Sequence, residues 1–237
     1  MLGIIGAMDL EVNALRHEMR DVKEQTIGFT RYYTGTLLGV PVCLARCGVG
    51  KVHAALCAQG MILALGVTRV LNIGVAGALL PQLQIGNIVV AESAVQHDMD
   101  TTPIGDPPGL ISGPNIVHIP TDPAMTALLD QAAKEAGLTA VRAAIATGDQ
   151  FIVGTDRKNA IARDFGAAAC DMEGGAIAQC CYEMQVPYAA VRAISDTRDG
   201  DGREYAEKAQ EACRAEEALL RRFLSLDQKA QEDQRHG

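Results

Sequence analysis

Residues 167–196, AAACDMEGGAIAQCCYEMQVPYAAVRAISD, decide the fold. The apolar run over 167–172 predicts a strand, residues 173–185 predict a helix, and the uninterrupted run over 186–195 predicts a second buried strand. A strand, a helix and a strand in this order form a right-handed crossover within one sheet. The stretch therefore predicts an α/β fold.

The rest of the chain continues this alternation of strands and helices. Further strands are expected over 2–8, on both sides of the turn at 39–41, and over 67–75, 85–96 and 141–148. Further helices are expected over 9–19, 52–65, 122–137, 156–164 and 203–226. We expect a single α/β sandwich domain over residues 1–226, with a polar, frayed tail over 227–237.

Composition excludes several classes of protein. The net charge of −8 and the pI of about 5.1 disfavour binding to nucleic acid or to acidic membranes, and only 4% of residues are aromatic. The amino end is unlike a secretory signal, and no apolar run is long enough for a membrane span. The 7 cysteines form no CxxC pair and lack zinc-ligand spacing, which favours reduced thiols, a cytoplasmic location and no metal.

Polar residues gather where the expected strands end: Glu11, Gly74, Asp149, Glu173 and Asp196. Ligands of α/β folds bind at such strand ends, so these positions locate a candidate site. Each residue also has a structural interpretation. Glu11 could be a surface residue of a helix, Glu173 a helix cap, and Asp196 a turn residue supported by its serine neighbour.

Two of these positions carry further chemical interest. Asp196 follows a buried strand, where desolvation would suit a carboxyl group to general-acid catalysis. Phe151 follows another strand, where its ring could stack on a planar ligand or simply pack in the core. The glycine-rich segments match neither a dinucleotide fingerprint nor a phosphate-binding loop, and no nucleophile elbow is present.

Seven segments together resemble the methylthioadenosine/S-adenosylhomocysteine nucleosidases of the purine nucleoside phosphorylase-like superfamily. In order they are GIIGAMDLEV, CGVGKVHAA, NIGVAGAL, IGNIVV, TGDQFIVGT, CDMEGGAIAQ and VPYAAVRAISD. The resemblance implies a three-layer α/β/α sandwich with a central mixed, twisted sheet. It also implies hydrolysis of the N-glycosidic bond of adenine thionucleosides, without a metal or cofactor.

The resemblance further implies roles for individual residues. Asp196 would be the general acid that protonates adenine N7, supported by Ser195, and Glu11 would activate the water, with Arg192 nearby. An oxocarbenium-like transition state needs one protonated and one ionised carboxyl group, which two different environments can supply. Asp171 is expected to be structural.

The substrate-binding residues follow from the same motifs. Glu173 would accept the ribose hydroxyls and Met172 would line the sugar. Phe151 would stack on adenine while the backbone of Ile152 reads the edge of the base. Met8 is also expected among the substrate-binding residues.

Three positions depart from the family pattern. Val75 replaces a serine expected to help hold the water, Tyr205 stands where a phenylalanine often closes the site, and Ile104 stands where a partner-chain aromatic is often found. The resemblance implies a homodimer in which the loop over 97–115 completes the neighbour's pocket. Another purine or futalosine-type nucleosidase or phosphorylase, or a non-catalytic purine-binding homologue, stays open.

Overall fold

The computed structural model describes residues 1–200 and 203–236. Its strands are β1 (Leu2–Gly6), β2 (Arg20–Ile27), β3 (Thr30–Leu37), β4 (Val40–Arg46), β5 (Arg69–Asn72), β6 (Val75–Ala78), β7 (Ile88–Gln96), β8 (Ile119–Pro120), β9 (Ala140–Thr147), β10 (Ala167–Asp171) and β11 (Tyr188–Asp196). Its helices are α1 (Asp9–Glu18), α2 (Lys51–Leu65), the 3₁₀ helix η1 (Thr102–Ile104), α3 (Pro123–Glu135), α4 (Thr155–Phe165), α5 (Gly174–Glu183) and α6 (Arg203–His236).

The described strands form one mixed sheet, in the order β2-β3-β4-β1-β5-β11-β6-β10-β9-β7-β8. Strands β4, β1, β5 and β11 are parallel, and β6 is parallel to β11 but antiparallel to β10. The two strands joined by α5, β10 and β11, are therefore antiparallel and have β6 between them, so the parallel crossover expected over 167–196 is wrong. Strand β11 also pairs with β7, which curls this half of the sheet back on itself. The expected mixed α/β fold is confirmed.

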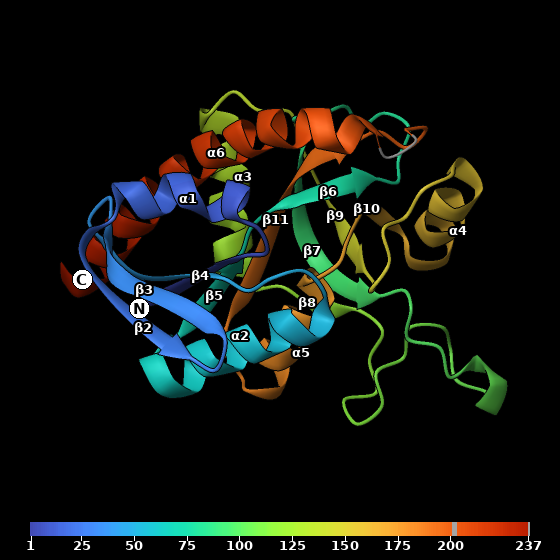
Figure 1. Ribbon diagram of the computed structural model, residues 1–237, viewed down its shortest axis with the longest axis horizontal. Coiled ribbons are helices and arrows are strands. Elements are labelled where there is room, and N and C mark those ends of the chain that lie inside the picture. Colours follow the sequence, from blue (N-terminus) through green and yellow to red (C-terminus); the bar gives the residue numbers. More distant parts are fainter. Residues whose placement is uncertain (201–202, 237) are drawn as a thin grey trace.

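Helices cover both faces of the sheet (Figure 1). Helices α1, α3 and α6 lie over one face, where they share a buried apolar cluster with β1, β4 and β11. Helices α2 and α5 lie over the other face, where they enclose a second cluster. The sheet is therefore buried between two helical layers, as expected for a three-layer sandwich.

Local sequence signals set several boundaries. The Asp122 side chain accepts a hydrogen bond from the Met125 N–H at 2.8 Å and caps α3, with Pro123 at the first helical position. Gly66 ends α2 in the left-handed conformation, with φ of 67°. These signals are local, which is why they can be read from the sequence.

Several elements differ from the sequence expectations. The strand expected over 67–75 is divided into β5 and β6, because the chain turns at Gly74, whose φ is 145°. Strand β2 has no apolar alternation, because it pairs only with β3 at the edge of the sheet and leaves its side chains exposed. Helix α6 does not end at 226 but continues to His236.

The extension of α6 has a tertiary cause. Asp227 is buried and accepts hydrogen bonds from Nη1 and Nη2 of Arg69 at 2.5 Å each, which ties the helix to the start of β5. The division into a domain over 1–226 and a tail over 227–237 stays a prediction. Among the described residues, none of the helices combines the length and apolar composition that a membrane span requires.

Candidate active site

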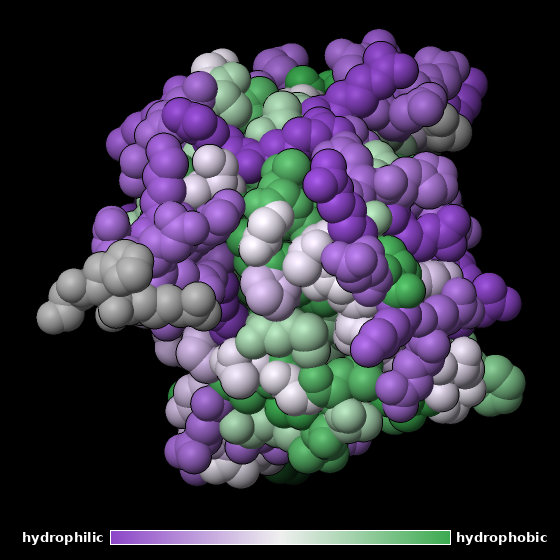
Figure 2. Space-filling model, turned by 90° about the vertical axis from the view of Figure 1, so that its left-hand side faces the viewer, coloured by the Kyte–Doolittle hydropathy of each residue, from purple (hydrophilic) through white to green (hydrophobic). Residues whose placement is uncertain are grey.

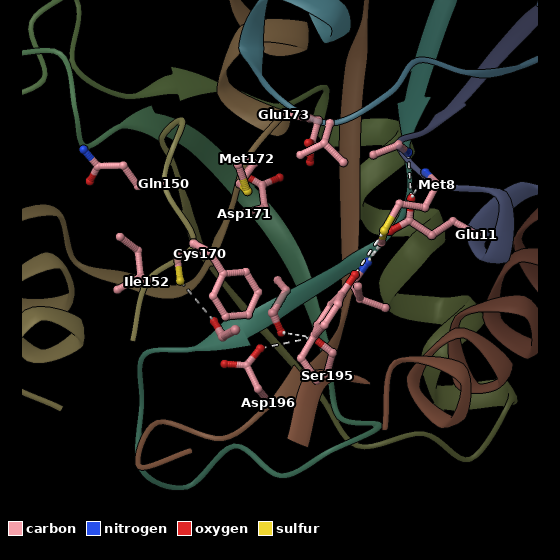
Figure 3. Close-up of a pocket in the computed structure, with 17 residues that line it drawn as sticks. Met8, Glu11, Gln150, Ile152, Cys170, Asp171, Met172, Glu173, Ser195 and Asp196 are labelled. Carbon is pink, nitrogen blue, oxygen red and sulfur yellow. Dashed lines mark hydrogen bonds between the residues drawn. The ribbon is translucent and has the colours of Figure 1, made fainter. Parts of the chain in front are cut away.

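A pocket opens where β1, β9, β10 and β11 end, and it holds about 550 Å³ with its open mouth included. Elements far apart in the sequence supply its walls (Figure 3). Ten of the residues singled out from the sequence line it: Met8, Glu11, Val75, Phe151, Ile152, Met172, Glu173, Ser195, Asp196 and Tyr205.

Glu11 is held by main-chain donors. Its Oε2 accepts hydrogen bonds from the N–H groups of Ala7 (2.6 Å) and Met8 (2.9 Å), and its Oε1 accepts one from Val75 (3.1 Å). The side chain is buried, so the surface-helix interpretation is wrong. Burial raises the pKa of Glu11, and the hydrogen bonds from the backbone only partly offset this effect.

Glu173 and Asp171 have different hydrogen-bond partners, although they lie only two positions apart in the sequence. Oε1 of Glu173 accepts a hydrogen bond from the Gly50 N–H at 2.8 Å, so its side chain does not cap its own helix. Asp171 accepts from the Gly174 N–H (2.9 Å) and from Nε of Arg192 (3.0 Å), and it therefore caps α5. Burial, and then the charge of Asp171, raises the pKa of Glu173 to about 7.

Asp196 ends β11 on the opposite side of the pocket from Glu173 and Glu11 (Figure 3). Its Oδ1 accepts a hydrogen bond from Ser195 Oγ at 3.2 Å, as expected for a supporting serine. Its Oδ2 accepts one from Nζ of Lys158 at 2.7 Å. Asp196 is thus buried in a salt bridge, which a turn residue would not need.

The sequence did not identify Lys158 and Glu216 as residues that contact the site. Lys158 lies in the polar run TDRKNA, but the buried residues of α4 are Lys158, Ile161 and Phe165, at helical spacing on one face. That spacing places Lys158 on the buried face of α4, and it is the sequence signal that could have identified this residue. Glu216 is a buried residue of α6 that accepts a hydrogen bond from the Gly74 N–H at 2.7 Å, and burial raises its pKa well above the usual range.

An aromatic pair borders the pocket. The rings of Phe151 and Tyr205 meet edge to face, with centroids 5.4 Å apart, and Tyr205 Oη lies 3.0 Å from Met8 Sδ. Phe151 is 49% exposed, so it does not pack in the core. One face of a planar ligand could stack there, in a wall that Ile152 extends.

Two expected residues do not line this pocket. Arg192 is fully buried behind it, where its guanidinium binds Asp171 and Asn72. Its positive charge offsets part of the rise that burial causes in the pKa values of Glu11 and Glu173. Ile104 is 82% exposed on η1, in the loop that projects from the body of the molecule (Figure 1). No group of three or more His, Cys, Asp or Glu side chains within 1–200 and 203–236 is placed to hold a metal ion.

The family model described as the phosphorylase superfamily matches residues 1–225. The chain belongs to this superfamily. The chain is also 35% identical to the 5'-methylthioadenosine/S-adenosylhomocysteine nucleosidase of Shewanella denitrificans, over 84% of the chain and 87% of that protein. The nucleosidase of Shewanella putrefaciens is 36% identical with the same coverage. The family resemblance read from the seven segments is confirmed.

Solved structures of superfamily members agree with this assignment. Futalosine hydrolase of Helicobacter pylori superimposes with a TM-score of 0.90 at 31% identity, covering 94% of this chain and 97% of that one. An aspartate-to-asparagine mutant of the Helicobacter pylori 5'-methylthioadenosine/S-adenosylhomocysteine nucleosidase contains 5'-methylthioadenosine in its active site. It superimposes with a TM-score of 0.89 at 32% identity, with the same coverage.

Proposed function

We propose that this chain hydrolyses the N-glycosidic bond of 5'-thioadenosine nucleosides such as 5'-methylthioadenosine and S-adenosylhomocysteine. The products are adenine and the 5-thioribose sugar. One observation carries the proposal: a single pocket presents buried carboxyl groups at both ends, with an aromatic wall beside them. The curated relatives at 35% and 36% identity are nucleosidases for these substrates.

We expect the nucleoside to bind in one orientation, with the base at the Asp196 end of the pocket and the ribose at the Glu173 end. Adenine stacks on Phe151, with its edge toward the backbone of Ile152 and its N7 toward Asp196. The ribose then lies between Met172 and Glu173, so that a Glu173 carboxylate oxygen can accept the sugar hydroxyls. The 5' substituent points toward Met8 and the exposed rim.

The two ends of the pocket perform different steps. Asp196 donates a proton to N7 as the bond between C1′ and N9 breaks, so the base leaves neutral. Glu11 accepts a proton from the water that adds to C1′, and its negative charge stabilises the positive charge developing on the sugar. A carboxylate held by three N–H groups is fixed in place before the reaction begins.

Val75 does not remove this arrangement. The family serine at that position would offer a side-chain hydroxyl, but the bond from residue 75 to Glu11 comes from the main chain, which valine retains. Water activation therefore persists without the hydroxyl. Loss of the hydroxyl also removes a donor that a bound phosphate could use, which favours hydrolysis over phosphorolysis.

The assay is adenine release from 5'-methylthioadenosine in buffer with and without phosphate. We expect equal rates in both buffers. A strict requirement for phosphate would contradict the proposal and indicate a phosphorylase. Because a futalosine hydrolase superimposes equally well, an aminofutalosine-type nucleoside is tested beside the thioadenosines. Turnover of that substrate alone would assign the chain to the second candidate function.

Absence of turnover with every nucleoside would favour a third candidate, a non-catalytic purine-binding homologue. Binding of adenine, measured by calorimetry, then distinguishes such a binding protein from an inactive preparation.

The same proposal includes a cytoplasmic homodimer. Helix α2 carries exposed apolar side chains, Val52, Leu56 and Leu63, and hydrophobic surface gathers in the lower part of the face shown in Figure 2, where α2 lies in Figure 1. The loop over 97–115, which contains Ile104, projects from the body of the molecule (Figure 1), where it could complete a neighbour's pocket. Light scattering of the purified chain tests this: a monomer at micromolar concentration would contradict it.

A further inference from the structure

A buried lysine faces the proposed general acid. Lys158 has no exposed side-chain surface, and its Nζ donates hydrogen bonds to Oδ2 of Asp196 (2.7 Å) and to the backbone carbonyl of Thr197 (2.8 Å). A buried ammonium group is costly unless it is paired, so the pair with Asp196 accounts for its presence. Lys158 lies on α4, directly after the loop that carries Phe151 and Ile152.

We propose that Lys158 is a positioning residue that acts through Asp196, by stabilising the carboxylate that Asp196 becomes when it protonates the leaving base. This inference rests on the proposed nucleosidase function. Lys158 itself does not line the pocket, so it does not touch the substrate.

The proton transfer explains why a fixed cation is useful. As the bond between C1′ and N9 breaks, its electron pair goes to adenine, and the proton of the Asp196 carboxyl group goes to N7. Water supplies the hydroxyl group of the sugar and passes its proton to Glu11. Glu11 then releases this proton to solvent, and Asp196 takes up a proton from solvent before the next reaction. By donating its proton to N7, Asp196 returns to the carboxylate form that it has in the salt bridge with Lys158. A cation at 2.7 Å therefore stabilises the transition state more than the substrate complex in which Asp196 still carries the proton.

The contacts also fix the orientation of the carboxyl group. Lys158 holds Oδ2 and Ser195 lies 3.2 Å from Oδ1, so both oxygens have a neighbour. A Cβ at Gly77 would lie 2.9 Å from Oδ2, so a side chain there would displace Asp196. Residues of α4 and β11 thus contact the two oxygens of the Asp196 carboxyl group, and Gly77 of β6 leaves space for it.

Other ionisable groups around this pair do not change charge near neutral pH. Burial raises the pKa of the Cys170 thiol, on β10, to about 12, and that of Tyr205, on α6, also to about 12. Asp199, in the loop after β11, is exposed, and its hydrogen bond with Arg198 lowers its pKa. Across the pocket, burial and then the charge of Asp171 raise the pKa of Glu173 to about 7, and Glu173 is unsubstituted in every variant compared below.

The test compares Lys158→Met, which removes the charge, with Lys158→Arg, which keeps it. For Lys158→Met we expect kcat to fall about 10- to 100-fold, part of what a general acid contributes, with KM changed less than about threefold. Because a cation beside a carboxyl group favours its ionised form, the basic limb of the kcat/KM profile should move up by about one pH unit or more in Lys158→Met. Lys158→Arg should restore the position of that limb.

Two further variants separate this role from a structural one. Arg163→Met removes an exposed ion-pairing cation from the same helix and should leave kcat and the pH profile unchanged. In an Asp196→Asn background, Lys158→Met should cause no further loss of activity, because there is no acid left to assist. This double variant buries no unpaired charge, so it stays measurable even if Lys158→Met alone fails to fold.

The outcomes are distinguishable. If the wild type releases adenine and folded Lys158→Met has the same kcat and the same basic limb, the role of Lys158 is wrong and the nucleosidase function stands. An additional loss in the Asp196→Asn background would equally overturn it. If the wild type releases no base from any nucleoside, the proposed function itself fails.

Discussion

Replacement of Glu11 by glutamine tests the water-activating role directly. The amide keeps the size of the side chain but cannot take a proton from water. Because general-base catalysis contributes about 10²- to 10⁴-fold, we expect kcat for adenine release to fall by at least about 100-fold. KM should change little, because the proposed role of Glu11 is to contact the water rather than the base.

The effect on stability follows from the three hydrogen bonds. The glutamine oxygen can accept from the N–H groups of Ala7 and Met8, as Oε2 of Glu11 does, and its NH₂ group then faces the Val75 N–H. One buried donor loses its acceptor, which costs about 1–3 kcal/mol. For a chain of this size that corresponds to a decrease of about 2–12 °C in Tm.

This cost should depend on pH with a defined sign. The folded-state pKa of Glu11 is raised, so its contribution to wild-type stability is present at low pH and is lost as the pH rises through that value. Glutamine does not titrate. The difference in Tm between wild type and Glu11→Gln should therefore be larger at pH 5 than at pH 8.

The assays are initial rates of adenine release and thermal unfolding at both pH values. Glu18→Gln is the matched control, since Glu18 lies on the same helix but pairs with Arg221 at the surface. The control should keep the wild-type kcat. A Glu11→Gln variant that is folded and retains more than about a tenth of the wild-type kcat would refute the assignment of Glu11.

Three further outcomes are expected. Asp196→Asn should lower kcat by about 10²- to 10⁴-fold but bind adenine within about tenfold of wild type in calorimetry. Loss of binding would point to a structural role. Gly74 has a φ of 145°, and an alanine Cβ there would lie 2.6 Å from Glu11 Oε1, so Gly74→Ala should lower kcat at least about tenfold. Gly86 also has a positive φ but has open space around it, so Gly86→Ala should lower stability without changing kcat. Because the pKa of Glu173 is raised to about 7, wild-type stability should fall relative to Glu173→Gln as the pH rises from 6 to 8, and parallel Tm curves would contradict this.

Local signals made most of the fold predictable. The strand and helix over 167–185 and the cap at Asp122 depend on neighbours within a few residues, so periodicity and capping rules identify them. The positions at strand ends were predictable for the same reason. Glu11, Glu173 and Asp196 each follow an expected strand, and all three line one pocket.

The partners of these residues were not predictable. Glu173 is bonded to Gly50, which is 123 residues away in the sequence, and Asp196 to Lys158, which is 38 residues away. A hydrogen bond between segments depends on the register of the sheet and on how each helix packs against it, and no local pattern reports either one. Lys158 consequently resembled any exposed lysine of a polar helix until α4 was placed.

The sequence alone determined the alternation of strands and helices, the family and the positions that could carry chemistry, because these properties depend on local composition and spacing. Tertiary structure decided the different states of two similar acids that both line the pocket. Asp171 and Glu173 are separated by one residue, yet Asp171 is paired with Arg192, whereas Glu173 accepts a hydrogen bond from the Gly50 N–H. The physical reason is that a buried carboxyl group takes its charge and direction from its partners, and folding supplies those partners from distant segments.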